Sequence, residues 1–207
     1  MSIKVAFVRN YLDKDSCEQL NQWVLEAIAQ GKIGRGITTA EGVHYLSNSR
    51  VVAEHRYTSR MYSENYEYPP LVKDIFTRIK TELNLKNAVV SSNGGRDGVV
   101  VSCTYPGGDV YLHKDPKEGG SVSLLRVNIL SKAATDGGSI HVEDAVFNLQ
   151  QGDMMAYLVD EYEHYVEPVK GADPRIMWMF GLLLPKHLWE SGIVGGHLTN
   201  EYIPSKQ

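Results

Sequence analysis

The feature that most constrains the fold of this chain is a change in hydrophobic pattern near residue 86. From there on, short apolar and β-branched runs alternate with segments rich in glycine, aspartate, asparagine and proline, which are typical of turns. Strands of this length and spacing are typical of a jelly roll or another barrel of two sheets, and such a cup can hold a small ligand. The expected strands are 87–92, 98–105, 109–115, 123–130, 138–144, 154–160, 164–169 and 175–184.

Two amphipathic helices are predicted before this region. Residues 13–31 carry apolar side chains three and four positions apart, with Asp13 or Asp15 as the N-cap and a glycine at the end. Residues 71–85 follow two prolines and show the same spacing. The stretch 31–42 is predicted to be a loop, and its scattered glycines give little support to a phosphate-binding site.

The length of the chain favours a single domain. At 207 residues it can bury a substantial core, and nothing in it requires a second domain. Residues 1–85 would form a helical support and a substrate lid, 86–190 the jelly-roll core that carries the site, and 191–207 a tail. The expected fold class is mainly β with flanking helices.

Composition and charge narrow the classes of partner. The formal net charge is −4 and the basic residues are scattered, so no nucleic-acid partner is expected. No segment approaches the roughly 20 apolar residues of a membrane span, and the first residues lack the apolar core of a signal peptide. Cys17 and Cys103 are far apart and are expected to be free thiols. We expect a cytoplasmic protein with a small-molecule partner; its oligomeric state does not follow from the sequence.

A pair of potential metal ligands stands at the end of one expected strand. His113 and Asp115 are two positions apart, so on a strand their side chains point to the same face. His164 follows several strands later, and in an antiparallel double sheet its strand can return beside the first. Two imidazoles and one carboxylate form the 2-His-1-carboxylate facial triad, which leaves positions of Fe(II) open for cosubstrate, oxygen and water. Any one of these histidines, taken alone, could instead be a surface or core residue.

Arg175 follows His164 and opens the apolar run 175–184. A guanidinium at the start of such a strand can bind a carboxylate through two parallel hydrogen bonds. The alternative is that its charged end simply extends to the rim of the barrel. Its place in the order after the three potential ligands favours carboxylate binding.

Four stretches between about Val100 and Leu184 resemble the Fe(II)/2-oxoglutarate-dependent dioxygenases, in particular the branch that includes the prolyl 4-hydroxylases. In that family a tyrosine-containing glycine turn precedes His-x-Asp, a Gly-Gly pair precedes a central strand, and a Gly-Asp turn opens the next. The family also has a recurring ending, H-x-V-x-P-V-x-x-G-x-R, which this chain matches with one residue fewer before the glycine and two extra residues before the arginine. The four stretches are "YPGGDVYLHKD", "LLRVNILSKAATDGGSI", "FNLQQGDMMAY" and "EHYVEPVKGADPRIMWMFG".

The resemblance implies a fold, a chemistry and a role for each matching residue. The core would be a double-stranded β-helix of the cupin type. His113, Asp115 and His164 would bind Fe(II), and Arg175 would pair with the distal carboxylate of 2-oxoglutarate. The cofactors would be Fe(II), 2-oxoglutarate and O2, with ascorbate as a possible aid, and the products would include succinate and CO2.

Two further positions and one departure follow from the same resemblance. Tyr105 and Asn128 are candidate hydrogen-bond partners of the cosubstrate, although Tyr105 could be a turn residue in water and Asn128 a satisfied sheet residue. Many members carry Ser or Thr two residues after the arginine, where this chain has Met177. Halogenating relatives lack the carboxylate ligand, so the presence of Asp115 favours hydroxylation or another oxidation.

The substrate is the least constrained part of the interpretation. Residues 55–70 concentrate arginines and tyrosines, and Arg56, Arg60 and Tyr62 are candidate substrate contacts in a lid. The same stretch could equally be an exposed loop with solvated charges.

The sequence leaves three functions open. The first is oxidation of an unactivated C–H bond of a small molecule, for example a free amino acid or a biosynthetic intermediate. The second is hydroxylation of a prolyl or other side chain in a protein or peptide. The third is a non-catalytic, cupin-like protein that binds a metal or ligand.

Overall fold

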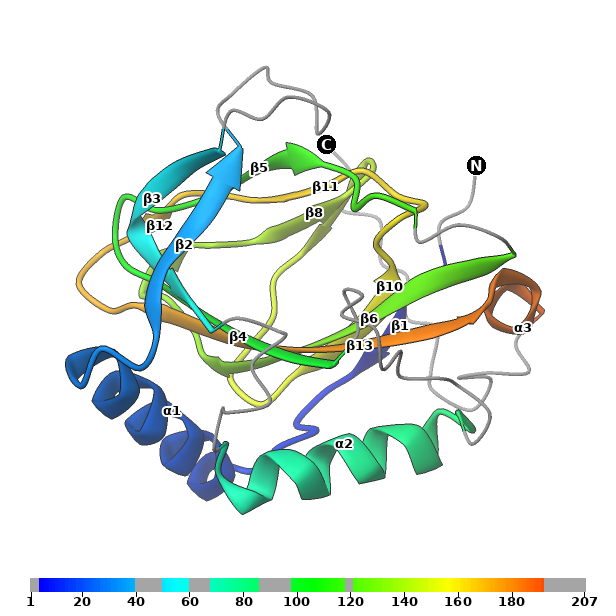
Figure 1. The fold of residues 1–207 in the computed structure, drawn as a ribbon, viewed down its shortest axis with the longest axis horizontal. Helices are drawn as coiled ribbons and strands as arrows, with labels where there is room; N and C mark the ends of the chain where they lie inside the picture. Colours follow the sequence, from blue (N-terminus) through cyan, green and yellow to red (C-terminus); the bar gives the residue numbers. More distant parts are fainter. Residues whose placement is uncertain (1–3, 40–49, 60–67, 86–97, 118–120, 192–207) are drawn as a thin grey trace.

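The structure is a computed structural model that describes residues 4–39, 50–59, 68–85, 98–117 and 121–191. Within these residues, sixteen elements follow one another (Figure 1). They are β1 (Ala6–Val8), α1 (Lys14–Ala29), β2 (Gly34–Thr39), β3 (Arg50–Thr58), α2 (Pro70–Glu82), β4 (Gly98–Thr104), β5 (Val110–His113), β6 (Val122–Lys132), β7 (Asp136–Gly137), β8 (Ile140–Val142), β9 (Ala145–Phe147), β10 (Met154–Leu158), β11 (His164–Val166), β12 (Val169–Lys170), β13 (Arg175–Pro185) and α3 (Lys186–Glu190).

Two antiparallel sheets face each other and form a cup. The larger has seven strands in the order β1-β10-β6-β13-β4-β3-β2, and the smaller has four in the order β5-β11-β8-β9. Helices α1 and α2 lie against the outer face of the larger sheet, below it in Figure 1. The prediction of a mainly β fold with a jelly-roll core and flanking helices is confirmed.

Both helices begin and pack as their sequences predict. The side chain of Asp13 caps α1, because the backbone N–H of Ser16 donates to its Oδ1 at 2.7 Å. The buried face of α1 includes Leu20 and Val24, which are fully buried against the sheet. Helix α2 begins at Pro70, a position where the missing proline N–H costs no hydrogen bond.

The larger sheet is buried on both faces, which explains its long apolar runs. On β6, Val127 and Ile129 belong to the apolar cluster under the helices, whereas Leu124 belongs to the cluster between the sheets. Side chains alternate along a strand, so Arg126 and Asn128 share the inner face with Leu124. The central strand therefore places two polar side chains inside the cup.

One predicted loop is a strand. Residues 31–42 were expected to be irregular, but Gly34–Thr39 forms β2, which pairs with β3 at the edge of the large sheet. The first residues of the predicted lid 55–70 also belong to a strand, because β3 continues to Thr58. Glycine-rich strands have weak local signals, and the pairing of β3 with β4 across the fold stabilises this edge.

Other predictions lie outside the described residues. These are the strand at 87–92 and the substrate candidates Arg60 and Tyr62. Strand β9 was not anticipated from the sequence; its three residues pair with β8.

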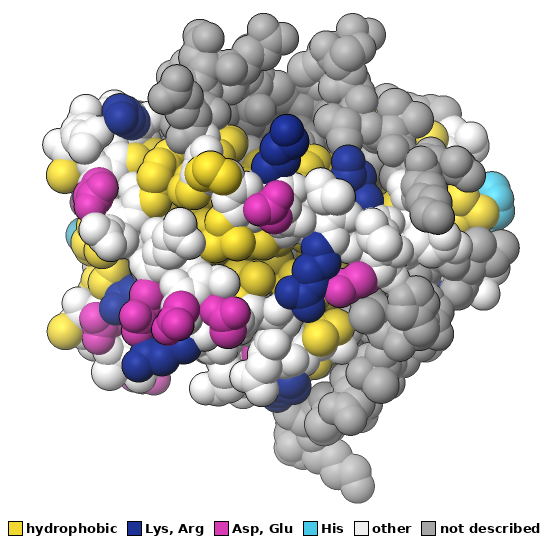
Figure 2. All heavy atoms as spheres, turned by 90° about the horizontal axis from the view of Figure 1, so that it is seen from below, with side chains coloured by type: hydrophobic (Ala, Val, Ile, Leu, Met, Phe, Trp, Pro, Cys, Tyr) yellow, Lys and Arg dark blue, Asp and Glu magenta, His cyan; other side chains and the backbone are white. Residues whose placement is uncertain are grey.

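The described surface mixes both signs of charge. On the face with the helices, seen in Figure 2, acidic and basic side chains lie interspersed among hydrophobic ones. No helix among the described residues is long and apolar enough to cross a membrane.

The N-cap of α1 offers a test of the fold. Asp13→Ala removes the acceptor for the Ser16 N–H and is expected to lower the free energy of unfolding by about 1 kcal/mol. Urea denaturation followed by circular dichroism measures this change. Asp15→Ala, an exposed change in the first turn, is the matched control and is expected to cost less than about 0.5 kcal/mol. Equal losses in the two variants would contradict the assignment of Asp13 as the cap.

Candidate active site

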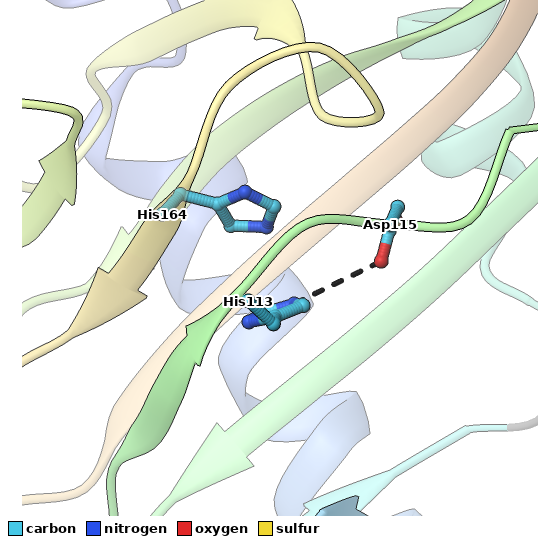
Figure 3. Close-up of side chains that lie close together, drawn as sticks. All are labelled: His113, Asp115 and His164. Carbon is cyan, nitrogen blue, oxygen red and sulfur yellow. Dashed lines mark ion pairs between the residues drawn. The ribbon is translucent and has the colours of Figure 1, made fainter. Parts of the chain in front are cut away.

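Strand pairing brings the three potential metal ligands together. Strand β5 ends at His113, β11 begins at His164, and these two residues are direct partners in the antiparallel register. Their ring centroids are 4.2 Å apart. Asp115 follows β5, and its Oδ1 lies 3.8 Å from His113 Nε2 (Figure 3). One ligand atom from each of the three residues lies within 4.8 Å of the others, which is a spacing that a single metal ion can bridge.

Backbone carbonyls orient both imidazoles. His113 Nδ1 lies 2.6 Å from the carbonyl oxygen of Tyr111, and His164 Nδ1 lies 3.0 Å from that of Tyr162. A ring that donates from Nδ1 presents the lone pair of Nε2, which is the form that binds a metal. Burial, followed by the proximity of His113, lowers the pKa of His164 to about 4. His164 is therefore neutral at neutral pH, as a metal ligand must be.

Asp115 is held at its backbone and at its side chain. Its N–H donates to the carbonyl oxygen of Val159 at 3.0 Å, which ties the segment after β5 to the end of β10. Arg126 donates from Nη2 to Asp115 Oδ2 at 3.1 Å, and both side chains are largely buried. Of the two carboxylate oxygens, Oδ2 therefore faces the guanidinium and Oδ1 faces His113.

Tyr157 completes this end of the cup. It is the register partner of Arg126 on the neighbouring strand, and its ring packs edge-on against that of His164 at 5.5 Å. Burial, and after it the charge of Asp115, raises the pKa of Tyr157, so its hydroxyl keeps its proton. The sequence reasoning singled out neither Arg126 nor Tyr157. A charged residue in the middle of the apolar run 122–132 was the available signal for Arg126.

A cavity of about 330 Å³ connects the metal ligands with the other polar groups of the cup. It lies between the two sheets. Its walls include the three potential ligands as well as Arg56, Asn128 and Arg175.

Arg175 is a buried cation in the wall of this cavity. It is the first residue of β13 and is 5% exposed, and among the described residues no carboxylate forms an ion pair with it. Burial, and then repulsion from Arg56, lowers the pKa of Arg175 to about 10, so it is still charged at neutral pH. A Cβ on Gly138 would lie 2.8 Å from Arg175 Cδ, so glycine is needed for the arginine to pass. A buried charge without a counterion is costly, and an anionic ligand would supply one.

Of the remaining site residues expected from the sequence, some line the cavity and one does not. Asn128 is 5% exposed and lines the cavity, and Met177 lines it too. Arg56 also lines it and donates from Nε to Ser102 Oγ at 2.9 Å. Tyr105 is not among the lining residues: its ring packs edge-on against Tyr57 at 5.7 Å, in the cluster on the helix side of the sheet.

Comparisons with known proteins identify the fold. No protein-family model matches the sequence, and no curated protein sequence matches it. A prolyl hydroxylase from Trichoplax adhaerens, solved with a peptide fragment of the oxygen degradation domain of hypoxia inducible factor, is 14% identical. The match covers 92% of this chain and 87% of that one, with a TM-score of 0.65.

Two further structures agree. The viral collagen prolyl hydroxylase from Paramecium bursaria Chlorella virus-1, in its 2OG complex, is 16% identical over 87% of this chain and 95% of that one, with a TM-score of 0.58. A prolyl-4-hydroxylase from Pseudomonas putida is 13% identical over 89% of this chain and 94% of that one, with a TM-score of 0.56. The chain therefore has the double-stranded β-helix fold of these prolyl hydroxylase structures, and its cup holds a set of two histidines and one carboxylate that could bind a metal ion.

Proposed function

We propose that this protein is an Fe(II)- and 2-oxoglutarate-dependent dioxygenase that hydroxylates, or otherwise oxidises, an unactivated C–H bond of a small molecule. The observation that carries the proposal is the meeting of His113, Asp115, His164 and the buried cation Arg175 in one cavity. The first three residues fit a divalent iron, and the fourth fits a cosubstrate that carries a carboxylate.

Each residue contributes a separate physical task. His113 and His164 would hold the metal through Nε2, since their Nδ1 atoms face backbone carbonyls. Iron, when bound, supplies the site at which 2-oxoglutarate and O2 react, with release of succinate and CO2. Arg175 would bind the distal carboxylate of 2-oxoglutarate, and Asn128 would donate its amide to the same molecule. Apolar residues in the same wall, such as Val159 and Met177, would strengthen these charged contacts by lowering the local dielectric constant.

The size and charge of the cavity favour a small, anionic substrate. About 330 Å³ is at the lower end of the range for ligand sites, and 2-oxoglutarate must share this space with the group to be oxidised. Arg56 lines the same cavity, with its guanidinium oriented by Ser102. We propose that Arg56 faces a carboxylate of the substrate, as a free amino acid or a biosynthetic intermediate would provide.

A protein or peptide substrate is the second candidate. It is favoured by the likeness to the Trichoplax adhaerens prolyl hydroxylase, which was solved with a bound peptide fragment. One side chain of a peptide could enter the same cavity while the rest stays outside. The third candidate is ligand binding without catalysis, and it differs from the other two in that the protein would not convert 2-oxoglutarate to succinate.

Succinate formation tests the enzymatic function. Protein loaded anaerobically with Fe(II) and then given 2-oxoglutarate, O2 and ascorbate is expected to form succinate, and His164→Ala is expected to reduce it to background. His141→Ala is the matched control, because His141 pairs with Glu167 at 2.7 Å and does not line the cavity. No succinate from the unmodified protein, together with no binding of 2-oxoglutarate, would leave the non-catalytic function in its place.

The role of Arg175 is tested by cosubstrate binding. Arg175→Met keeps most of the side-chain volume but removes the charge, and loss of one partner of a buried ion pair costs about 2–5 kcal/mol. The affinity of the Mn(II)-loaded protein for 2-oxoglutarate is therefore expected to fall by roughly 30-fold or more in calorimetric titrations. The affinity for Mn(II) itself should stay unchanged, and an unchanged affinity for 2-oxoglutarate would exclude Arg175 as its anchor.

The substrate class is tested with a panel of free amino acids and proline-containing peptides. We expect free amino acids, and not peptides, to stimulate succinate formation. Arg56→Gln should raise the KM for the stimulating amino acid and leave the KM for the cosubstrate unchanged, because only the substrate carboxylate would lose its cation. Stimulation by peptides alone would select the second candidate function.

A further inference from the structure

Arg126 is not one of the potential metal ligands, but its side chain contacts one of them, Asp115. We infer that Arg126 is a positioning residue, which holds one oxygen of Asp115 so that this carboxylate binds the metal through the other oxygen alone. The inference rests on the proposed function only in that it needs a metal ion at His113, Asp115 and His164.

The contact between Arg126 and Asp115 is well placed for this task. Arg126 lies in the middle of β6, a strand with neighbours on both sides in the large sheet. Its Nη2 is 3.1 Å from Asp115 Oδ2, and the two side chains are 9% and 13% exposed. A charge-assisted hydrogen bond of this kind, largely out of water, is among the stronger ones in proteins. Arg126, on the central strand β6, therefore holds the side chain of Asp115, which lies beyond the end of β5.

The contact between Arg126 and Asp115 matters because a metal ion has a limited number of coordination positions. A carboxylate that binds through both oxygens would occupy one position more than a carboxylate that binds through one. If these residues bind Fe(II) as a facial triad, its remaining positions would have to stay open for 2-oxoglutarate and O2. Because Oδ2 accepts from Arg126, Oδ1, which faces His113, would be the oxygen that binds the metal.

The charge of Arg126 and its hydrogen bond to Asp115 are expected to change the affinity for the metal in opposite directions. By Coulomb's law alone, a nearby guanidinium repels a divalent cation, so its removal would tighten metal binding. Loss of an outer hydrogen bond to a metal ligand instead weakens binding, typically 10- to 100-fold. The two effects have opposite signs, and the positioning role predicts that the second one dominates.

Metal titration tests the inference without any need for turnover. The probe is Co(II), titrated into the metal-free full chain, with the Kd from a competing chelator and the coordination from the visible absorption of the bound ion. Arg126→Met is expected to raise the Kd for Co(II) by about 10- to 100-fold and to change this spectrum. Arg126→Lys, which keeps the charge but not the planar fork, is expected to lie between Arg126→Met and the unmodified protein.

A double-mutant cycle shows whether the effect passes through Asp115. Asp115→Asn will weaken Co(II) binding by itself, and adding Arg126→Met to it is expected to change the Kd by less than about 3-fold. An equal or tighter Kd in Arg126→Met overturns the inference, and so does an undiminished effect in the Asp115→Asn background. If Arg126→Met fails to fold, the same comparisons are made with Arg126→Lys. If the Co(II) results are as expected but the Fe(II)-loaded protein neither forms succinate nor binds 2-oxoglutarate, the dioxygenase function is refuted and this inference stands.

Discussion

The antiparallel pairing of β5 with β11 is the constraint on which the site depends. It sets His113 directly opposite His164, and side chains alternate between the faces of a strand. A slip of one residue would turn one imidazole out of the cup, so the three potential metal ligands can meet only in this register. Main-chain contacts hold the surrounding parts: carbonyls orient both rings, and the N–H of Asp115 binds Val159.

The interior of the cup combines apolar walls with buried positive charge. Two apolar clusters surround the central sheet, so a charge inside the cup needs a partner close at hand. Arg126 finds its partner within the chain, in Asp115. Arg175 has no carboxylate partner among the described residues, and a ligand would supply it. Both guanidinium groups line the cavity, and they differ in that Arg126 also forms an ion pair with a carboxylate of the chain.

Most of the regular structure could be predicted because its signals are local. Asp13, the apolar spacing of α1 and the prolines before α2 all act within a few residues, and the structure agrees with each. Strand β2 could not be predicted, since its stability comes from pairing with β3 and not from its own residues. Tyr105 shows the same limit at the site. A motif implied a role inside the cup, but the residue packs with Tyr57 on the other side of the sheet.

The sequence by itself determined the ligand types, their order along the chain and the closeness of His113 and Asp115, because residues two positions apart cannot lie far from each other. Only the tertiary structure decided that His164 lies opposite His113, that Arg126 holds Asp115, and that Arg175 reaches the same cavity. These contacts join residues on different strands. Their geometry depends on the order and register of the sheets, which arise from the packing of the whole core and are not encoded in any one segment.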